Sequence, residues 1–78
     1  AYAVITGQKR WMLELFTGLA RRADPAGADR LGRALMLLHE GALVAHGLGV
    51  FPDPFGAALD QARGLLESGA APREAPLR

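Results

Sequence analysis

Few side chains in this 78-residue chain could take part in chemistry, and the most notable are two histidines and a glutamate. His39 and His46 lie seven residues apart in a segment with helical periodicity, which places their rings about 10 Å apart along one side of a helix. Two residues of one helix that share a metal ion are instead three or four residues apart. We therefore expect no shared metal, and we interpret both histidines as polar groups at the edge of an interface or pocket.

Catalysis is not expected either. Glu40 points about 100° away from His39 around the helix, so we do not expect these neighbours to form an acid–base pair. The chain has no cysteine. No serine, threonine or aspartate is placed in the sequence so that it could form a triad of nucleophile, base and orienting group. We predict no catalytic residue, no metal site and no cofactor, and hence a protein that is not an enzyme.

Size and composition favour association with another chain. Half of the residues are hydrophobic, but a domain this small buries only about 60% of its unfolded surface and usually needs extra stabilisation. With no disulfide available, a second chain could supply it. The net charge of +1 is not typical of a nucleic-acid-binding face, and no signal peptide or apolar run long enough to span a membrane is visible. We expect a cytoplasmic protein with no membrane contact.

Residues 31–50 form the element that positions both histidines. At 100° per residue, one arc of this helix carries Leu31, Ala34, Leu35, Leu38, Ala42 and Ala45. A flank of the same arc carries Leu37, Gly41, Val44 and Leu48. Met36 and Leu43 occupy a further side. Because a surface helix needs only one apolar stripe, we expect this helix to be covered on two sides, by its own chain and by something else.

Three helices are predicted, at about residues 7–22, 29–48 and 53–68. Asp24 before Pro25 disfavours continuation of the first helix, and Gly47 or Gly49 can end the second. Asp53 followed by Pro54 is typical of a helix start. Residues 1–6 are interpreted as the end of a connection, and residues 69–78 as a flexible tail that begins at Gly69.

Gly41 lies in the middle of the second helix, where it costs about 1 kcal/mol of helix propensity. With Ala42 and Ala45 it offers a surface of small side chains, which favours a close crossing with another helix. We interpret this crossing as an interface between chains, with contact inside one chain as the alternative. Aromatic and methionine residues of the first two helices could line an apolar pocket, although plain core is the usual role of such a stripe.

The last two helices resemble the C-terminal end of TetR-family bacterial transcriptional regulators. The similarity rests on Leu35, Leu38, Gly41 and Ala42, and on an alanine- and leucine-rich last helix after a Gly/Pro/Asp turn. The matching residues of that turn and helix are Asp53, Pro54, Ala58, Ala62 and Leu66. The resemblance covers about residues 8–68, and its small hydrophobic motifs are moderately specific.

This resemblance implies an all-α, three-helix segment whose last two helices form half of a dimeric four-helix bundle. Residues 1–68 would be a regulatory region that couples the binding of a small apolar effector to repression. Operator DNA would be bound only through an N-terminal helix-turn-helix that these residues do not contain. The expected homodimer interface comprises Leu38, Gly41, Ala42, Ala45, Leu59, Ala62 and Leu66. The expected pocket lining comprises Trp11, Leu15, Phe16 and Met36. The alternative is a stand-alone helical interaction module with no small-molecule ligand.

Overall fold

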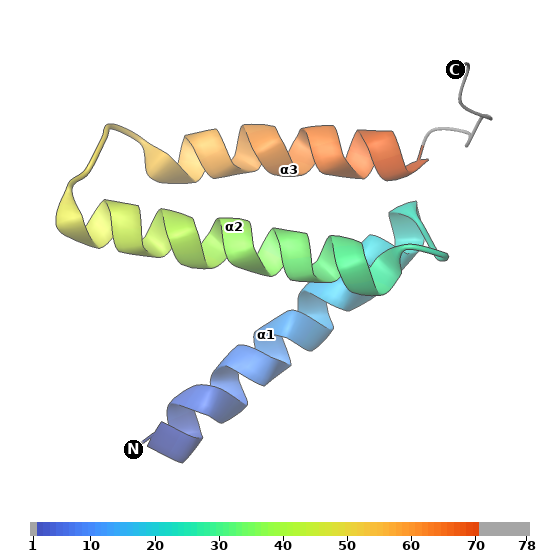
Figure 1. Cartoon of the computed structure of the whole chain (residues 1–78), viewed down its shortest axis with the longest axis horizontal. Helices are drawn as coiled ribbons and strands as arrows, with labels where there is room; N and C mark the ends of the chain where they lie inside the picture. The colour runs from blue at the N-terminus through green and yellow to red at the C-terminus, as the bar shows by residue number, and fades with distance from the viewer. Residues whose placement is uncertain (1, 71–78) are drawn as a thin grey trace.

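The computed structural model describes residues 2–70, and the side chains of residues 2–68, as three helices. These are α1 (Tyr2–Ala23), α2 (Ala28–Leu48) and α3 (Pro54–Ala70). Figure 1 shows α2 and α3 side by side and running in opposite directions, while α1 crosses α2 obliquely and diverges from α3 toward its N-terminus. The prediction of an all-α, three-helix chain is confirmed for this part of the sequence.

Helix α1 begins at Tyr2, so the interpretation of the first residues as the end of a connection is wrong for residues 2–6. Residue 1 lies outside the described part. The β-branched residues Val4 and Ile5 lower helix propensity only slightly, and nothing else in this stretch opposes a helix. The hydroxyl of Thr6 donates a hydrogen bond to the Tyr2 carbonyl one turn earlier, at 3.0 Å. Thr6 therefore lies inside the helix.

The turn between α1 and α2 is held by Asp24, which is buried. Its backbone N–H donates to the Ala20 carbonyl at 2.8 Å, and its carboxylate accepts the N–H of Gly27 at 3.1 Å. Gly27 is the N-cap of α2. The predicted break at Asp24 and Pro25 is confirmed, and this short turn folds α2 back across the C-terminal half of α1.

The turn between α2 and α3 uses both of its predicted signals. Gly49 adopts the left-handed conformation at φ 66°, and the N–H groups of Gly49 and Val50 donate to the carbonyls of His46 and Ala45 at 3.2 and 3.1 Å. This is the Schellman arrangement that ends many helices. The Asp53 carboxylate then accepts the N–H of Gly56 at 3.0 Å, as a helix cap does.

Helix α3 continues through Gly69 to Ala70, so the predicted end of the helix at Gly69 is wrong by two residues. A single glycine near a helix end costs about 1 kcal/mol and does not by itself stop the helix. Residues 71–78, the remainder of the predicted flexible tail, lie outside the described residues. The observed starts of α2 and α3 differ by one residue from the predicted ones.

The hydrophobic core is small and lies where the three helices meet. It consists of the buried residues Ala20, Ala28, Leu31 and Leu35, with Phe16, Ala23, Ala62 and Leu66 packed against them. In contrast, fifteen large apolar side chains within the described residues are more than a third exposed. Scattered exposed apolar residues are ordinary, whereas contiguous exposed apolar patches often mark interaction sites.

Candidate functional site

An open apolar groove of about 250 Å³ lies between α2 and α3. The α2 wall of the groove comprises Leu37, Leu38, Gly41, Ala42 and Ala45. The other wall comprises Phe51 from the turn and Pro54, Ala57, Ala58 and Gln61 from α3. None of these ten side chains is charged, and Gln61 is the only polar one. The groove can therefore hold apolar side chains or an apolar molecule, but it offers no group for acid–base or nucleophilic chemistry.

The shape of this groove follows from the sizes of its side chains. Ala45, Ala57 and Ala58 are too short to fill the space between the two helix backbones, so the groove stays open. At its border, Leu37 is 71% exposed and Phe51 is 48% exposed, although both are large and apolar. Large exposed residues beside a hollow are the surface that a partner would cover, since they lose the most water-accessible apolar area on contact.

The structure brings together four of the seven expected interface residues. Leu38, Gly41, Ala42 and Ala45 all line the groove. The other three lie on α3 but not in the groove: Leu59, Ala62 and Leu66. Ala62 and Leu66 pack against the core of their own chain, and Leu59 is half-exposed. Contacts within the chain therefore already account for two of these residues.

The space around Gly41 in the groove is open. A Cβ atom added there would meet no atom within 4 Å, so no helix of this chain crosses α2 closely at Gly41. The close crossing within the chain is at Gly32, where an added Cβ would lie 2.7 Å from the Cα of Thr17 in α1. Sequence reasoning missed Gly32. Its position between the buried Leu31 and Leu35, on the face that packs inward, was the available signal.

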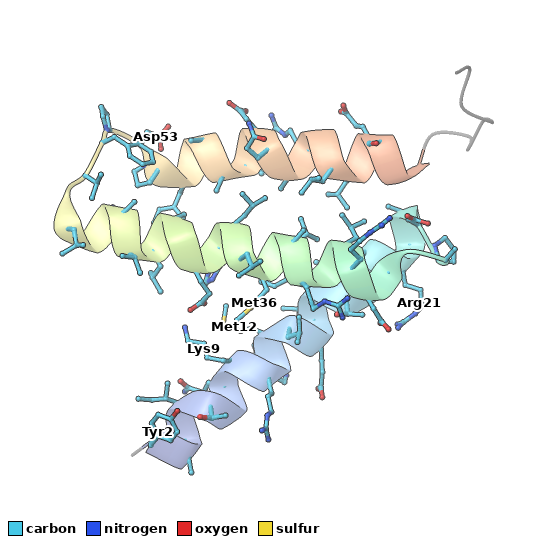
Figure 2. The ribbon with its side chains drawn as sticks, viewed as in Figure 1. Tyr2, Lys9, Met12, Arg21, Met36 and Asp53 are labelled. Carbon is cyan, nitrogen blue, oxygen red and sulfur yellow. The ribbon has the colours of Figure 1, made fainter. Side chains whose placement is uncertain are left out.

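The expected pocket residues are divided between two sides of α1. Phe16 packs against the core, and its ring lies 5.7 Å from the His39 ring. Met12 and Met36 point toward one another in the view of Figure 2, and both are partly buried. Trp11 is 62% exposed, and Leu15 is half-exposed on the same outer side of α1. The structure therefore does not bring Trp11 and Leu15 together with Met36.

A cluster of three polar side chains connects α1 to α2. The Glu40 carboxylate accepts hydrogen bonds from the Lys9 ammonium at 3.0 Å and from Nδ1 of His39 at 3.2 Å. Because a carboxylate only accepts, Nδ1 is the protonated nitrogen of His39 when this bond forms. Lys9, as the stronger donor, holds the pKa of Glu40 below its usual range, and His39 adds to the effect.

His39 and Glu40 are thus in contact, although the helical positions alone placed Glu40 about 100° away from His39. The two side chains leave the helix in different directions, but the flexible glutamate turns toward Lys9 and brings its carboxylate within reach of the imidazole. His46 has a different neighbour, since its ring lies 5.5 Å from that of Phe55 in α3. Within the described residues, no group of three or more histidine, cysteine, aspartate and glutamate side chains could hold a metal ion.

Two further observations concern the kind of protein that this chain is. No helix within residues 2–70 is both long enough and apolar enough to cross a membrane. Comparison of the sequence and structure with protein-family models, curated proteins and solved structures finds no match. The described residues therefore show a small all-α protein of three helices, with an open apolar groove between α2 and α3.

Proposed function

We propose that this chain is the dimerisation and ligand-sensing part of a transcriptional regulator similar to the TetR family. The observation that carries the proposal is the groove between α2 and α3, which is apolar, uncharged and bordered by exposed large side chains. A second copy of the chain is the occupant that the resemblance implies. Stable interfaces bury roughly 1,600 Å² in total, and a two-helix face of this kind can supply such an area.

The sensing half of the proposal rests on how α1 meets α2. The two helices touch closely at Gly32 and Thr17, and farther toward the N-terminus of α1 they are joined by the Lys9–Glu40 pair. Met12 and Met36, whose side chains adapt easily to different shapes, lie between these two contacts. An apolar effector that inserts beside the methionines would shift α1 against α2, and thereby change the orientation of whatever α1 is joined to in the intact regulator.

A stand-alone dimerisation module without a small-molecule ligand is the second candidate. It is favoured by the exposure of Trp11 and Leu15, which leaves the expected pocket incomplete. Both candidates share the dimer interface and differ only in whether the region between α1 and α2 binds a ligand.

Neighbouring residues of α2 allow the two functions to be tested separately. Met36 is partly buried on the α1 side, whereas Leu37 borders the groove. We expect Leu37→Glu to dissociate the dimer in size-exclusion chromatography, because a buried carboxylate without a partner is strongly unfavourable. We expect Met36→Glu to leave the dimer intact and to reduce binding of the apolar fluorophore 1-anilinonaphthalene-8-sulfonate. Equal fluorophore binding by wild type and Met36→Glu would favour the module without a ligand.

A further inference from the structure

Helix α1 carries a stripe of large apolar side chains that the other described residues leave exposed. Trp11 is 62% exposed, and the other three members are between 48% and 61% exposed: Val4, Leu15 and Leu19. At 100° per residue, the four side chains lie within about 80° of one another around the helix. At 1.5 Å per residue, the distance from Val4 to Leu19 along the helix axis is about 22 Å. We call these four residues the α1 stripe.

Packing inside the chain uses the other side of α1. Ala20 is fully buried, Phe16 packs against the core, and Lys9 forms an ion pair with Glu40 of α2. The three α1 positions are about 140–180° from Trp11 around the helix. The α1 stripe therefore lies on the side of α1 opposite α2, where it contributes nothing to the core.

Positive charge accompanies this stripe. The basic residues of α1 outnumber its one acidic residue, Glu14. Three of them are exposed and make no ion pair within residues 2–68: Arg10, Arg21 and Arg22. Arg22 follows Leu19 on the same side of the helix, and the other two arginines lie within about 100° of Trp11. The exposed side of α1 is thus apolar along its length and basic beside and beyond the stripe.

An acidic helix and an anionic bilayer are the two partners that match this charge and apolar character. A partner helix usually binds in a groove between two helices. The α1 stripe instead follows a single helix, and Figure 1 shows that the N-terminal part of α1 diverges from α3. A flat surface can contact such a helix along its whole length. Tryptophan is also enriched at the boundary between lipid and water.

We propose that the α1 stripe docks on the surface of a bilayer that contains anionic lipids, with α1 lying in the plane of that surface. Trp11 and Leu15 enter the boundary between headgroups and acyl chains, while Arg21 and Arg22 contact lipid phosphates. The sequence predicts no membrane contact because it has no spanning segment, but a helix that lies on a bilayer inserts only about 5–10 Å and needs none. This inference goes beyond the proposed function and does not depend on it.

Vesicle binding by the full chain tests the inference, and the chain reports on it directly. Trp11 is the only tryptophan in the sequence. Vesicles of equal amounts of phosphatidylcholine and phosphatidylglycerol should shift its fluorescence to shorter wavelength and should carry the chain with them in flotation. Vesicles of phosphatidylcholine alone should bind at least fivefold more weakly, because they lack the charge that attracts the arginines. Added salt should weaken binding to the anionic vesicles, because it screens this attraction.

The apolar part of the contact is tested by Leu15→Glu. We expect this variant to bind anionic vesicles at least about tenfold more weakly, because it replaces a leucine that would leave water with a charge. Leu43→Glu is the matched control, since Leu43 is 43% exposed on α2 and belongs to neither the α1 stripe nor the groove. The control should bind as the wild type does. Far-UV circular dichroism of both variants shows whether the helices are retained.

The charged part is tested by Arg22→Gln, which changes no apolar residue. A basic residue close to an anionic surface strengthens binding about fivefold, so the variant should lose about that factor on anionic vesicles and nothing on phosphatidylcholine alone. Arg63→Gln is the matched control, because Arg63 is an exposed arginine of α3 without an ion pair in the described part of the chain. It should bind both kinds of vesicle as the wild type does.

Several results would overturn the inference. One is a wild-type chain that binds neither kind of vesicle at low salt, or binds both equally. Another is an equal loss in a variant and its matched control, which would show that the contact is not made through the α1 stripe. A shift of Trp11 fluorescence with protein concentration alone, and no response to vesicles, would mean that a second copy covers the stripe instead of a bilayer.

Discussion

Gly32 lies so close to Thr17 that a Cβ atom on it would be 2.7 Å from the Thr17 Cα atom. Glycine at this position lets α2 cross α1 at backbone distance, beside the buried core residues. We expect Gly32→Ala to lower the free energy of unfolding by about 1–3 kcal/mol, because backbone and not only a flexible side chain must move. Urea unfolding followed by circular dichroism measures the change.

Gly18 of α1 provides the control for this substitution. An added Cβ there meets no atom within 4 Å, so Gly18→Ala should only improve helix propensity, by up to about 1 kcal/mol. Opposite signs for the two alanine substitutions are therefore expected. A Gly32→Ala protein as stable as wild type would mean that the helices do not cross as closely as described.

Asp53 caps α3 while holding a backbone conformation that is uncommon outside glycine and asparagine, with φ of 52°. We expect Asp53→Ala to destabilise the chain by about 0.5–2 kcal/mol, because the bond to the Gly56 N–H is lost. Asp53→Asn should cost less, since asparagine caps helices and tolerates the left-handed region. Thermal unfolding of both variants checks the order, and an equal loss in both would show that the cap contributes little.

Glu40 makes the attachment of α1 dependent on pH. Its pKa is lower in the folded chain than in the unfolded one, chiefly because of the bond from Lys9. The stabilisation is therefore fully present at pH values above the ordinary pKa of glutamate. It is lost as the pH falls through the lowered pKa of Glu40. We expect hydrogen exchange of α1 backbone amides near Lys9 to accelerate on acidification through this range.

Substitution of Lys9 tests the cause of this dependence. In Lys9→Gln the pKa of Glu40 should rise toward its usual range, as followed by the side-chain carboxyl shift in NMR. Arg10→Gln is the control, because Arg10 is exposed and makes no ion pair within the described residues. If both variants shift the Glu40 titration equally, general positive charge on α1 and not the Lys9 contact is responsible.

Substitution of Gly41 separates an effect on the stability of one chain from an effect on the association between chains. The space around it is open, so Gly41→Leu should leave the fold intact and improve helix propensity by up to about 1 kcal/mol. The same leucine would project into the centre of the proposed interface and prevent the two copies of α2 from approaching. We expect a folded monomer, seen as unchanged helix content and a smaller hydrodynamic radius. A Gly41→Leu protein that remained dimeric would exclude a close crossing at this position.

Helix positions and turns could be predicted from the sequence because their signals are local. Gly49 and Asp53 each satisfy backbone groups within a few residues, and both act as expected. The start of α1 was missed because residues 1–6 were interpreted as the end of a connection. The β-branched Val4 and Ile5 favour a helix only weakly, but such small differences in propensity are readily overridden.

Relations between helices were harder to predict. Gly32 and Gly41 look alike in the sequence, and only the packed structure shows that α1 occupies the space above one and leaves the other open. The contact of His39 with Glu40 was missed for a similar reason, since it depends on a lysine thirty-one residues away from the glutamate. The groove itself was anticipated only in part, because Ala62 and Leu66 face the core of their own chain.

Sedimentation equilibrium of the wild-type chain across a wide concentration range tests the central claim most directly. A second copy that covers the α2–α3 groove predicts a mass twice the monomer value of 8.2 kDa, with dissociation only on dilution. A compact monomer of 8.2 kDa at the highest concentration would contradict the account, because the exposed apolar residues along the groove would then need no partner.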